Sequence, residues 1–164
     1  MGVRCFVALG ANLGDPVATV KAALVALREL PQAKLVAASS LYRTAPVGLR
    51  HQPDFINAVV EMSTVSPAPT FLAQLFAVEA RFGRRRSVPN APRTLDLDLL
   101  LYGDLVSRDV QLTLPHPRLH ERAFVLAPLA EIVPELHIPG LGSVSELLAC
   151  CVGQRIERLP VARE

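Results

Sequence analysis

The chain has 164 residues, of which 51% are of hydrophobic types and 20% are charged, and its formal net charge is +2. This length suits one domain, and a domain of this size buries about 70% of the surface of its unfolded chain, which is enough for a core without metal or disulfide staples. The apolar content and small net charge exclude an intrinsically disordered chain, and 5% aromatic residues without tryptophan are too few for a nucleic-acid platform of stacked rings.

The first predicted elements are a strand and a helix. Phe6–Leu9 is an apolar run that stops at Gly10, which indicates a short buried strand. Asp15 and Pro16 are typical of a helix N-cap followed by the first helical position. Apolar residues at helical spacing then predict a helix that continues to about Leu30.

The rest of the chain predicts an α+β order. The further elements are strands at 35–43 and 55–64, a helix from Phe71 to Phe82 closed by Gly83, a strand at 95–102, a short strand at 112–114, a helix at 123–132, a short helix at 143–150 and a final strand at 155–159. We expect Pro128 to kink the helix at 123–132 or to start a new segment. The order β-α-β-β-α-β with additions at the C-terminal end is that of a ferredoxin-like α+β sandwich, and we predict one catalytic domain over residues 1–164.

The chain carries no sign of membrane attachment or of a disulfide framework. No apolar run approaches the ~18 residues of a membrane span, and the N-terminal apolar run is too short for a signal peptide. The adjacent Cys150 and Cys151 follow an apolar stretch, and we expect them to be small buried hydrophobic residues. We therefore expect a cytoplasmic protein that binds no membrane.

Two carboxylates in one predicted strand are the first candidate site. Strand periodicity places the leucines at alternate positions 95–101 toward the core, so that Asp96 and Asp98 share the opposite face, with Cα atoms about 6–7 Å apart. Like charges this close favour a cation between them, and Mg²⁺ is usually held by one or two carboxylates plus substrate phosphates. The alternative interpretation is an exposed strand that carries two solvated acids.

Arginines precede this acid pair. Of the 17 basic residues, 15 are arginines, and five of them lie between Glu79 and Asp96: Arg81, Arg84, Arg85, Arg86 and Arg93. The planar guanidinium group suits phosphate oxygens, although a solvated basic loop is an alternative. With the two acids, the cluster predicts a site for a nucleoside triphosphate and its metal. The sequence holds no Gly-x-x-x-x-Gly-Lys loop, so side chains and metal would bind the phosphates.

His116 lies between Pro115 and Pro117, in a loop that we expect to be stiff. Its ring could donate a hydrogen bond to a phosphate, or it could be a histidine with a structural role. The other histidines share no metal-ligand spacing with it, which argues against a zinc site.

Seven ordered motifs extend over most of the chain. They are Leu9-Gly10-Ala11-Asn12-Leu13-Gly14-Asp15, Ser40-Leu41-Tyr42-Arg43-Thr44, Gln52-Pro53-Asp54-Phe55-Ile56-Asn57, Glu79 with the Arg84 and Arg86 loop, Pro92-Arg93-Thr94-Leu95-Asp96-Leu97-Asp98, Leu114-Pro115-His116-Pro117, and Arg122-Ala123-Phe124-Val125-Leu126. With these motifs the sequence resembles the 6-hydroxymethyl-7,8-dihydropterin pyrophosphokinase family of folate biosynthesis.

The resemblance implies transfer of the terminal pyrophosphoryl group of ATP to the hydroxymethyl oxygen of 6-hydroxymethyl-7,8-dihydropterin, with release of AMP. It implies that Asp96 and Asp98 hold two Mg²⁺ ions and that Arg84 and Arg86 close over ATP; these four are the expected catalytic residues. The implied ATP contacts are Glu79, Arg84, Arg86, Arg93, Leu99, Thr113, His116 and Arg122. The implied pterin contacts are Thr44, Pro46, Val47, Gly48, Phe55, Asn57, Asp96 and Phe124.

The sequence departs from the family pattern at Pro89, Asn90 and Ala91, and at Pro117, where a tyrosine is frequent. These departures affect adenine-side and loop-closure contacts. Two alternatives stay open at this point, a ferredoxin-like RNA-binding module and a related nucleotide-binding protein that has lost catalysis. We expect a monomer that binds no nucleic acid.

Overall fold

The structure is a computed structural model that describes residues 2–45, 53–83 and 94–160. Its strands are β1 (Val3–Ala11), β2 (Ala33–Ala38), β3 (Tyr42–Thr44), β4 (Phe55–Thr64), β5 (Asp96–Tyr102), β6 (Ser107–Asp109), β7 (Leu112–Leu114), β8 (His137–Ile138), β9 (Gly142–Ser143) and β10 (Ile156–Arg158). Its helices are α1 (Pro16–Arg28), α2 (Ala68–Arg81), α3 (Ala123–Ile132) and α4 (Val144–Ala149), with a 3₁₀ turn at Leu119–Glu121. Among the described residues, no helix combines the length and apolar character needed to cross a membrane.

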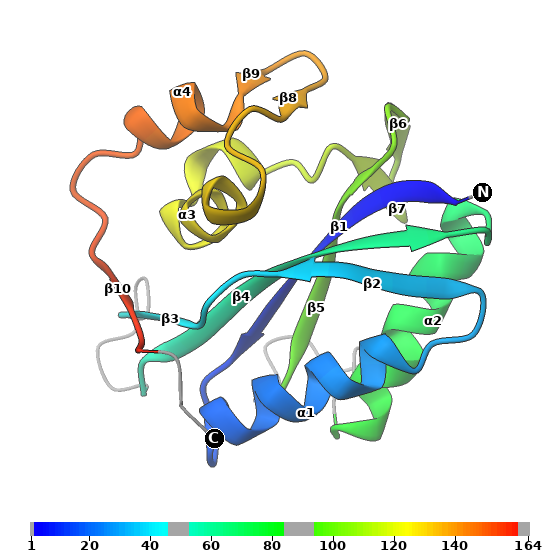
Figure 1. Ribbon diagram of the computed structural model, residues 1–164, viewed down its shortest axis with the longest axis horizontal. Helices are drawn as coiled ribbons and strands as arrows, with labels where there is room; N and C mark the ends of the chain where they lie inside the picture. Colours follow the sequence, from blue (N-terminus) through cyan, green and yellow to red (C-terminus); the bar gives the residue numbers. More distant parts are fainter. Residues whose placement is uncertain (1, 46–52, 84–93, 161–164) are drawn as a thin grey trace.

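The main sheet confirms the ferredoxin-like prediction. Its central strands lie in the order β5-β1-β4-β2, and every neighbouring pair is antiparallel. β3 also pairs with β4, beyond the end of β2, and β10 pairs with β3 (Figure 1). β10, the last strand described, thus extends the sheet beyond β3.

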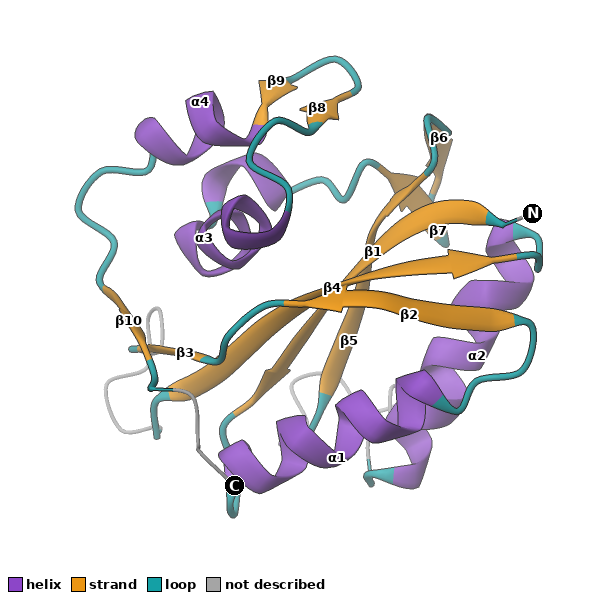
Figure 2. Ribbon diagram, viewed as in Figure 1, coloured by secondary structure: helices purple, strands orange, loops and turns teal. Residues whose placement is uncertain are grey.

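Helices cover the sheet on both faces. α1 and α2 lie on one face, whereas α3 lies on the other face with α4 against it (Figure 2). The first layer buries Val7, Leu9 and Leu75 in a common core. The second layer buries Phe6, Val59 and Leu126, on the face that α3 covers.

The alternation predicted for β5 holds for most of its length. Leu97 and Leu99 pack in the core with α1 and α2, so Asp96 and Asp98 face the other way. The prediction is wrong for Leu101, which packs with Leu100 in the α3 layer. The register shifts opposite Phe6 and Val7, and this bulge reverses the faces of the residues that follow.

The single strand predicted at 35–43 is divided into β2 and β3. At the break, the Ser39 N–H donates to the Val59 carbonyl at 2.9 Å, and the Val59 N–H donates to the Ser39 hydroxyl oxygen at 2.9 Å. A serine side chain therefore replaces a backbone partner of β4 at this point. β2 and β3 then pair with opposite ends of β4.

Other expectations hold in part. β1 does not stop at Gly10 but continues to Ala11, and α3 contains Pro128 without a break. The prediction that both vicinal cysteines are buried is wrong, because Cys150 is exposed and Cys151 is half-buried. β7 confirms the short strand predicted at 112–114. The strands of the β6–β7 hairpin have three residues each and those of the β8–β9 hairpin have two each, so β6, β8 and β9 carry too few residues for a periodic pattern.

Candidate functional site

Three residues form a row across three neighbouring strands, near one end of the sheet. Asp96 of β5 pairs with Gly10 of β1, and Gly10 pairs with Asn57 of β4. Residues directly opposite in a sheet project to the same face, and this face is the one opposite α1 and α2. Asp98 pairs with Ala8 in the next row but one. The two predicted metal ligands and the predicted pterin amide thus share one face at one end of the sheet.

Gly10 leaves room for the Asn57 amide. A Cβ atom at Gly10 would lie 3.2 Å from the Asn57 Oδ1, which is tighter than an ordinary contact. The other end of that amide is also held, because Asn57 Nδ2 donates to the Thr44 hydroxyl oxygen at 2.8 Å. Asn57 is only 5% exposed. The amide is therefore fixed in orientation, with its donor toward Thr44 and its acceptor over Gly10.

Glu79 supports the acid pair from the opposite side of β5. This α2 residue is 1% exposed, and its Oε2 accepts a hydrogen bond of 2.7 Å from the backbone N–H of Leu97. Leu97 separates Asp96 from Asp98, and β5 is an edge strand of the sheet. The carboxylate therefore satisfies a strand N–H at the exact place where the two aspartates turn outward.

His116 lies beside β5, near Asp98. Its backbone N–H donates to the Leu100 carbonyl at 2.9 Å, and its Nδ1 accepts from the Arg118 N–H at 3.3 Å. Burial lowers the pKa of His116, against the opposing effect of the Asp98 charge, and the Arg122 and Arg118 charges lower it further. Because Nδ1 accepts, a neutral imidazole carries its proton on Nε2 and can donate it to an anion.

Arg122 and Phe124 come from the start of α3. Arg122 is the N-cap residue of the helix, and its guanidinium carbon lies 5.4 Å from the centroid of the Phe124 ring. The Asp98 charge raises the pKa of His116 and the Arg122 charge lowers it, so both charged groups lie near the His116 ring. The structure thus brings two of the predicted phosphate contacts, His116 and Arg122, close to Asp98.

Two predicted residues have side chains engaged elsewhere. The Leu99 side chain packs in the core with α1 and α2, so a nucleotide on the opposite face would meet only its backbone. The Thr113 hydroxyl donates to the Asp109 carbonyl at 2.9 Å, inside the β6–β7 hairpin. Six other predicted residues lie outside the described residues: Pro46, Val47, Gly48, Arg84, Arg86 and Arg93.

A hydrogen-bond network around the Glu131 carboxylate, between α3 and β3, was not predicted. Glu131 of α3 accepts from the Tyr42 hydroxyl at 2.7 Å, from the Ser40 N–H at 2.9 Å and from the Ser40 hydroxyl at 2.8 Å. Arg158 of β10 donates to the same carboxylate at 2.9 Å. These partners lie 27 to 91 residues from Glu131 in the chain, so no local sequence pattern could reveal them.

The acid pair has the composition of a magnesium site that a substrate completes. Among the described residues, no group of three or more His, Cys, Asp and Glu side chains could enclose a metal ion. Two carboxylates on one face agree with Mg²⁺, which commonly takes one or two protein carboxylates together with phosphate oxygens. The residues present therefore fit a metal that arrives with a phosphate ligand.

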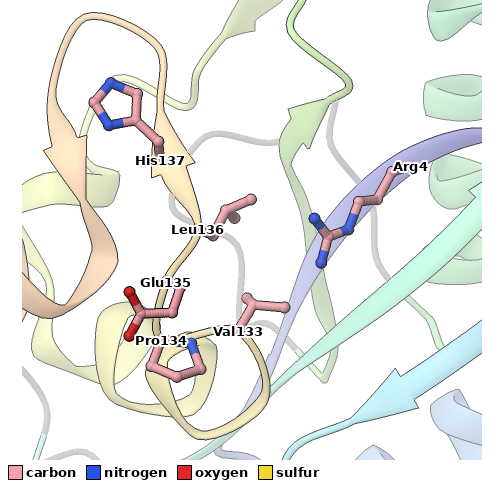
Figure 3. Close-up of a pocket in the computed structure, with 6 residues that line it drawn as sticks. All are labelled: Arg4, Val133, Pro134, Glu135, Leu136 and His137. Carbon is pink, nitrogen blue, oxygen red and sulfur yellow. The ribbon is translucent and has the colours of Figure 1, made fainter.

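A separate cavity of about 390 Å³ lies away from this site. It is bounded by Arg4 of β1 and by the segment 133–137, which follows α3 (Figure 3). Arg4 is already paired with Glu61 at 3.0 Å and lies 5.2 Å from the Phe6 ring centroid. This cavity contains none of the predicted site residues.

Known proteins match the chain over most of its length. Residues 6–134 match the family model described as 7,8-dihydro-6-hydroxymethylpterin-pyrophosphokinase (HPPK). A Pseudomonas aeruginosa protein named 2-amino-4-hydroxy-6-hydroxymethyldihydropteridine pyrophosphokinase is 44% identical over 159 residues, covering 97% of this chain and 98% of that protein. Proteins of the same name from Haemophilus influenzae and Bacillus subtilis are each 40% identical, and cover 89% and 80% of this chain and 91% and 78% of their own lengths.

Solved structures support the fold. A Plasmodium falciparum HPPK-DHPS crystal structure superposes with a TM-score of 0.73 at 13% identity and covers 91% of this chain. A crystal structure of HPPK-DHPS in complex with substrates has a TM-score of 0.73 at 12% identity. The chain spans 45% and 43% of these two solved chains, so their likeness concerns the fold of one part of each.

Proposed function

The chain belongs to the 7,8-dihydro-6-hydroxymethylpterin-pyrophosphokinase family, and we propose that its Asp96 and Asp98 bind the Mg²⁺ that accompanies ATP. It is an enzyme of folate biosynthesis that transfers pyrophosphate from ATP to hydroxymethyldihydropterin. This family membership favours the enzyme over an RNA-binding module with the same sheet topology.

One observation carries the assignment of the site. Asp96 and Asn57 lie in a single row across the sheet, with only Gly10 between them. A metal-bound phosphate at Asp96 and a pterin at Asn57 would therefore be neighbours on one face. Proximity of this kind is the main contribution that a protein makes to phosphoryl-type transfer.

The pterin side offers what a flat polar heterocycle needs. The Asn57 amide can donate and accept, and its orientation is fixed by Thr44 and Gly10. Phe55 begins β4, two residues before Asn57 and on the same face, and Phe124 begins α3. We assign these two rings to stacking on the pterin. Pro46, Val47 and Gly48 belong to the same proposal through the family resemblance.

The phosphate side combines acids with cationic groups. Arg122 lies close enough to His116 to lower its pKa, and the Nε2 proton of neutral His116 can be donated to a phosphate oxygen. Arg84, Arg86 and Arg93 belong to this proposal because five arginines precede the acid pair in the sequence. The Leu99 backbone and Thr113 complete the proposed nucleotide side, whereas Glu79 supports it through the Leu97 N–H.

The transfer forms one bond and breaks one bond. The hydroxymethyl oxygen attacks the β-phosphorus in line, and the bond from that phosphorus to the oxygen that bridges to the α-phosphate breaks. AMP leaves with the bridging oxygen, and the hydroxyl proton passes to solvent. Mg²⁺ held by Asp96 and Asp98 would supply positive charge to the phosphate oxygens, while Asn57, Arg122 and His116 hold the two substrates in line.

Removing the carboxylate charges tests this assignment. We expect Asp96→Asn and Asp98→Asn each to lower the rate of AMP release about 100-fold, equivalent to about 2.7 kcal/mol of barrier, and to raise the Mg²⁺ concentration required. Asp104→Asn changes an exposed aspartate outside the site and should retain the parent rate. Normal AMP release by both site variants would overturn the metal assignment, whereas the family membership would stand.

We propose two Mg²⁺ ions, a monomer, a cytoplasmic location where ATP and Mg²⁺ are available, and one catalytic domain over residues 1–164. The contacts of β10 with β3 and of Arg158 with α3 support a single domain, since the end of the chain packs on its first half. Metal titration against AMP release, sedimentation and limited proteolysis measure the ion number, the oligomeric state and the domain extent.

A further inference from the structure

Gln154 makes a two-sided contact with the start of α3. Its Oε1 accepts from the backbone N–H of Ala123 at 2.9 Å, and its Nε2 donates to the backbone carbonyl of Glu121 at 2.8 Å. Gln154 lies in the segment between α4 and β10, more than 30 residues further along the chain. One amide side chain therefore holds the peptide groups on both sides of Arg122.

These two bonds replace a local cap. Arg122 is the N-cap of α3 with an extended backbone at φ −117° and ψ 106°, and its side chain makes no capping hydrogen bond to the helix. The first N–H groups of a helix lack intrahelical partners, and Ala123 is only 3% exposed. The side-chain carbonyl oxygen of Gln154 satisfies this buried N–H, a role that the Arg122 guanidinium cannot fill because it is only a hydrogen-bond donor.

The contact controls the direction of two site residues. Arg122 and Phe124 flank Ala123, and both take their direction from the peptide groups at the helix start. A rotation of either peptide group would change the direction of the Arg122 side chain and of the helix start that carries Phe124. The segment that contains Gln154 then continues to β10, which pairs with β3 beside the pterin side (Figure 1).

We propose that Gln154 is a positioning residue, which fixes Arg122 and Phe124 for the two substrates through the backbone of Glu121 and Ala123. This inference rests on the proposed function of Arg122 and Phe124. Gln154 lies outside the residues 6–134 that match the family model, so this proposal gives a role to the C-terminal part of the chain.

Two variants of the full-length chain separate the two halves of the contact. Gln154→Ala removes both hydrogen bonds, and we expect kcat/KM to fall about 5- to 20-fold. Gln154→Glu keeps an acceptor for Ala123 but places a carboxylate oxygen against the Glu121 carbonyl, so we expect a similar loss with the helix start still capped. Arg155→Ala, at the exposed next residue, is the matched control and should keep the parent kcat/KM.

A double-mutant cycle with Arg122→Ala distinguishes positioning from a general loss of stability. If Gln154 acts through Arg122, Gln154→Ala lowers kcat/KM by a smaller factor when Arg122 is already alanine, because only the placement of Phe124 is then left to lose. Additive effects that follow the change in Tm would overturn the proposal, and so would an unchanged kcat/KM in both Gln154 variants. If Gln154→Ala does not fold, Gln154→Glu decides by the same criteria. If Arg122→Ala itself keeps full activity, the proposed function of Arg122 is wrong.

Discussion

The buried Glu79 carboxylate accepts a 2.7 Å hydrogen bond from the backbone N–H of Leu97, the residue between Asp96 and Asp98. An acid of α2 thus holds the edge strand from the face opposite the proposed metal ligands. The position of the two aspartates depends on this contact, since a shift of the Leu97 peptide moves both neighbours.

We predict that Glu79→Ala lowers the free energy of unfolding by about 2–3 kcal/mol, because it leaves a buried N–H without this acceptor. Glu79→Gln keeps a carbonyl oxygen, so its loss should be about 1 kcal/mol. Denaturant unfolding measures both values, and the exposed Glu29→Ala serves as the control. Magnesium titration of AMP release should show a higher requirement in Glu79→Ala. Equal stability of all three variants would contradict the role of the contact.

The second prediction concerns Gly10, whose missing side chain leaves space for the Asn57 amide. In Gly10→Ala the new Cβ would lie 3.2 Å from Asn57 Oδ1, so the amide must move by a few tenths of an ångström. We expect the KM for the pterin to rise about 3- to 10-fold, because small displacements of positioning groups weaken productive binding. The KM for ATP is the internal control and should change less than twofold. A pterin KM equal to that of the parent would place the ring elsewhere.

Local patterns predicted the part of the site that depends on local geometry. Strand alternation placed Asp96 and Asp98 on one face, and the cap signal at Asp15 corresponds to a hydrogen bond of 3.2 Å from the Ala18 N–H to its Oδ1. The break at Ser39 escaped prediction, because its hydroxyl is paired with Val59, 20 residues away. Alternation also cannot show a bulge, since a bulge depends on the register with a neighbouring strand.

Contacts between distant residues were equally hidden. Neither the Glu131 network nor the Gln154 contact has a spacing that marks it, because the partners lie 27 to 91 residues apart in the chain. The motifs that resemble the family pointed to the residues that face the substrates. They did not reveal the residues that hold those side chains in place.

The third prediction is an acid-dependent stability from Glu131. Burial alone would raise the pKa of this carboxyl, but hydrogen bonds from Tyr42 and Ser40 and the Arg158 charge lower it overall. A lowered pKa in the folded state means that this stability is present above the unfolded pKa of about 4.3 and is lost as the pH falls through the folded value. Glu131→Gln should therefore be about 1–3 kcal/mol less stable than the parent at pH 7.

The same difference should shrink as the pH is lowered below about 4, where the parent carboxyl takes up its proton. Urea unfolding of the two proteins between about pH 3 and 7 measures this. Glu135→Gln, an exposed change in the same region, should follow the parent curve. A constant difference between Glu131→Gln and the parent over this range would show that the charge of Glu131 contributes no stability.

The fourth prediction concerns alkaline pH and the hydroxyl of Tyr42. Burial raises the pKa of Tyr42 to about 12, and the hydrogen bond to Glu131 and the Glu131 charge raise it as well, against the Arg158 charge. Because the folded pKa exceeds the unfolded value of about 10, the contribution of Tyr42 is present below about pH 10 and is lost as the pH rises toward 12.

Tyr42→Phe should thus be about 1–2 kcal/mol less stable than the parent at pH 8, and the difference should narrow between about pH 10 and 12. Tyr102, the second of the two tyrosines, also has a raised pKa from burial and from the Cys5 charge, and its hydroxyl donates to the Ser66 carbonyl at 2.6 Å. Tyr102 is common to Tyr42→Phe and the parent, so its own contribution cancels in their difference. Burial also raises the Cys5 pKa to about 12, but this group is common to all the variants and cancels in the differences. Stability curves of Tyr42→Phe and the parent that stay parallel over this range would show that ionisation of Tyr42 does not oppose the fold.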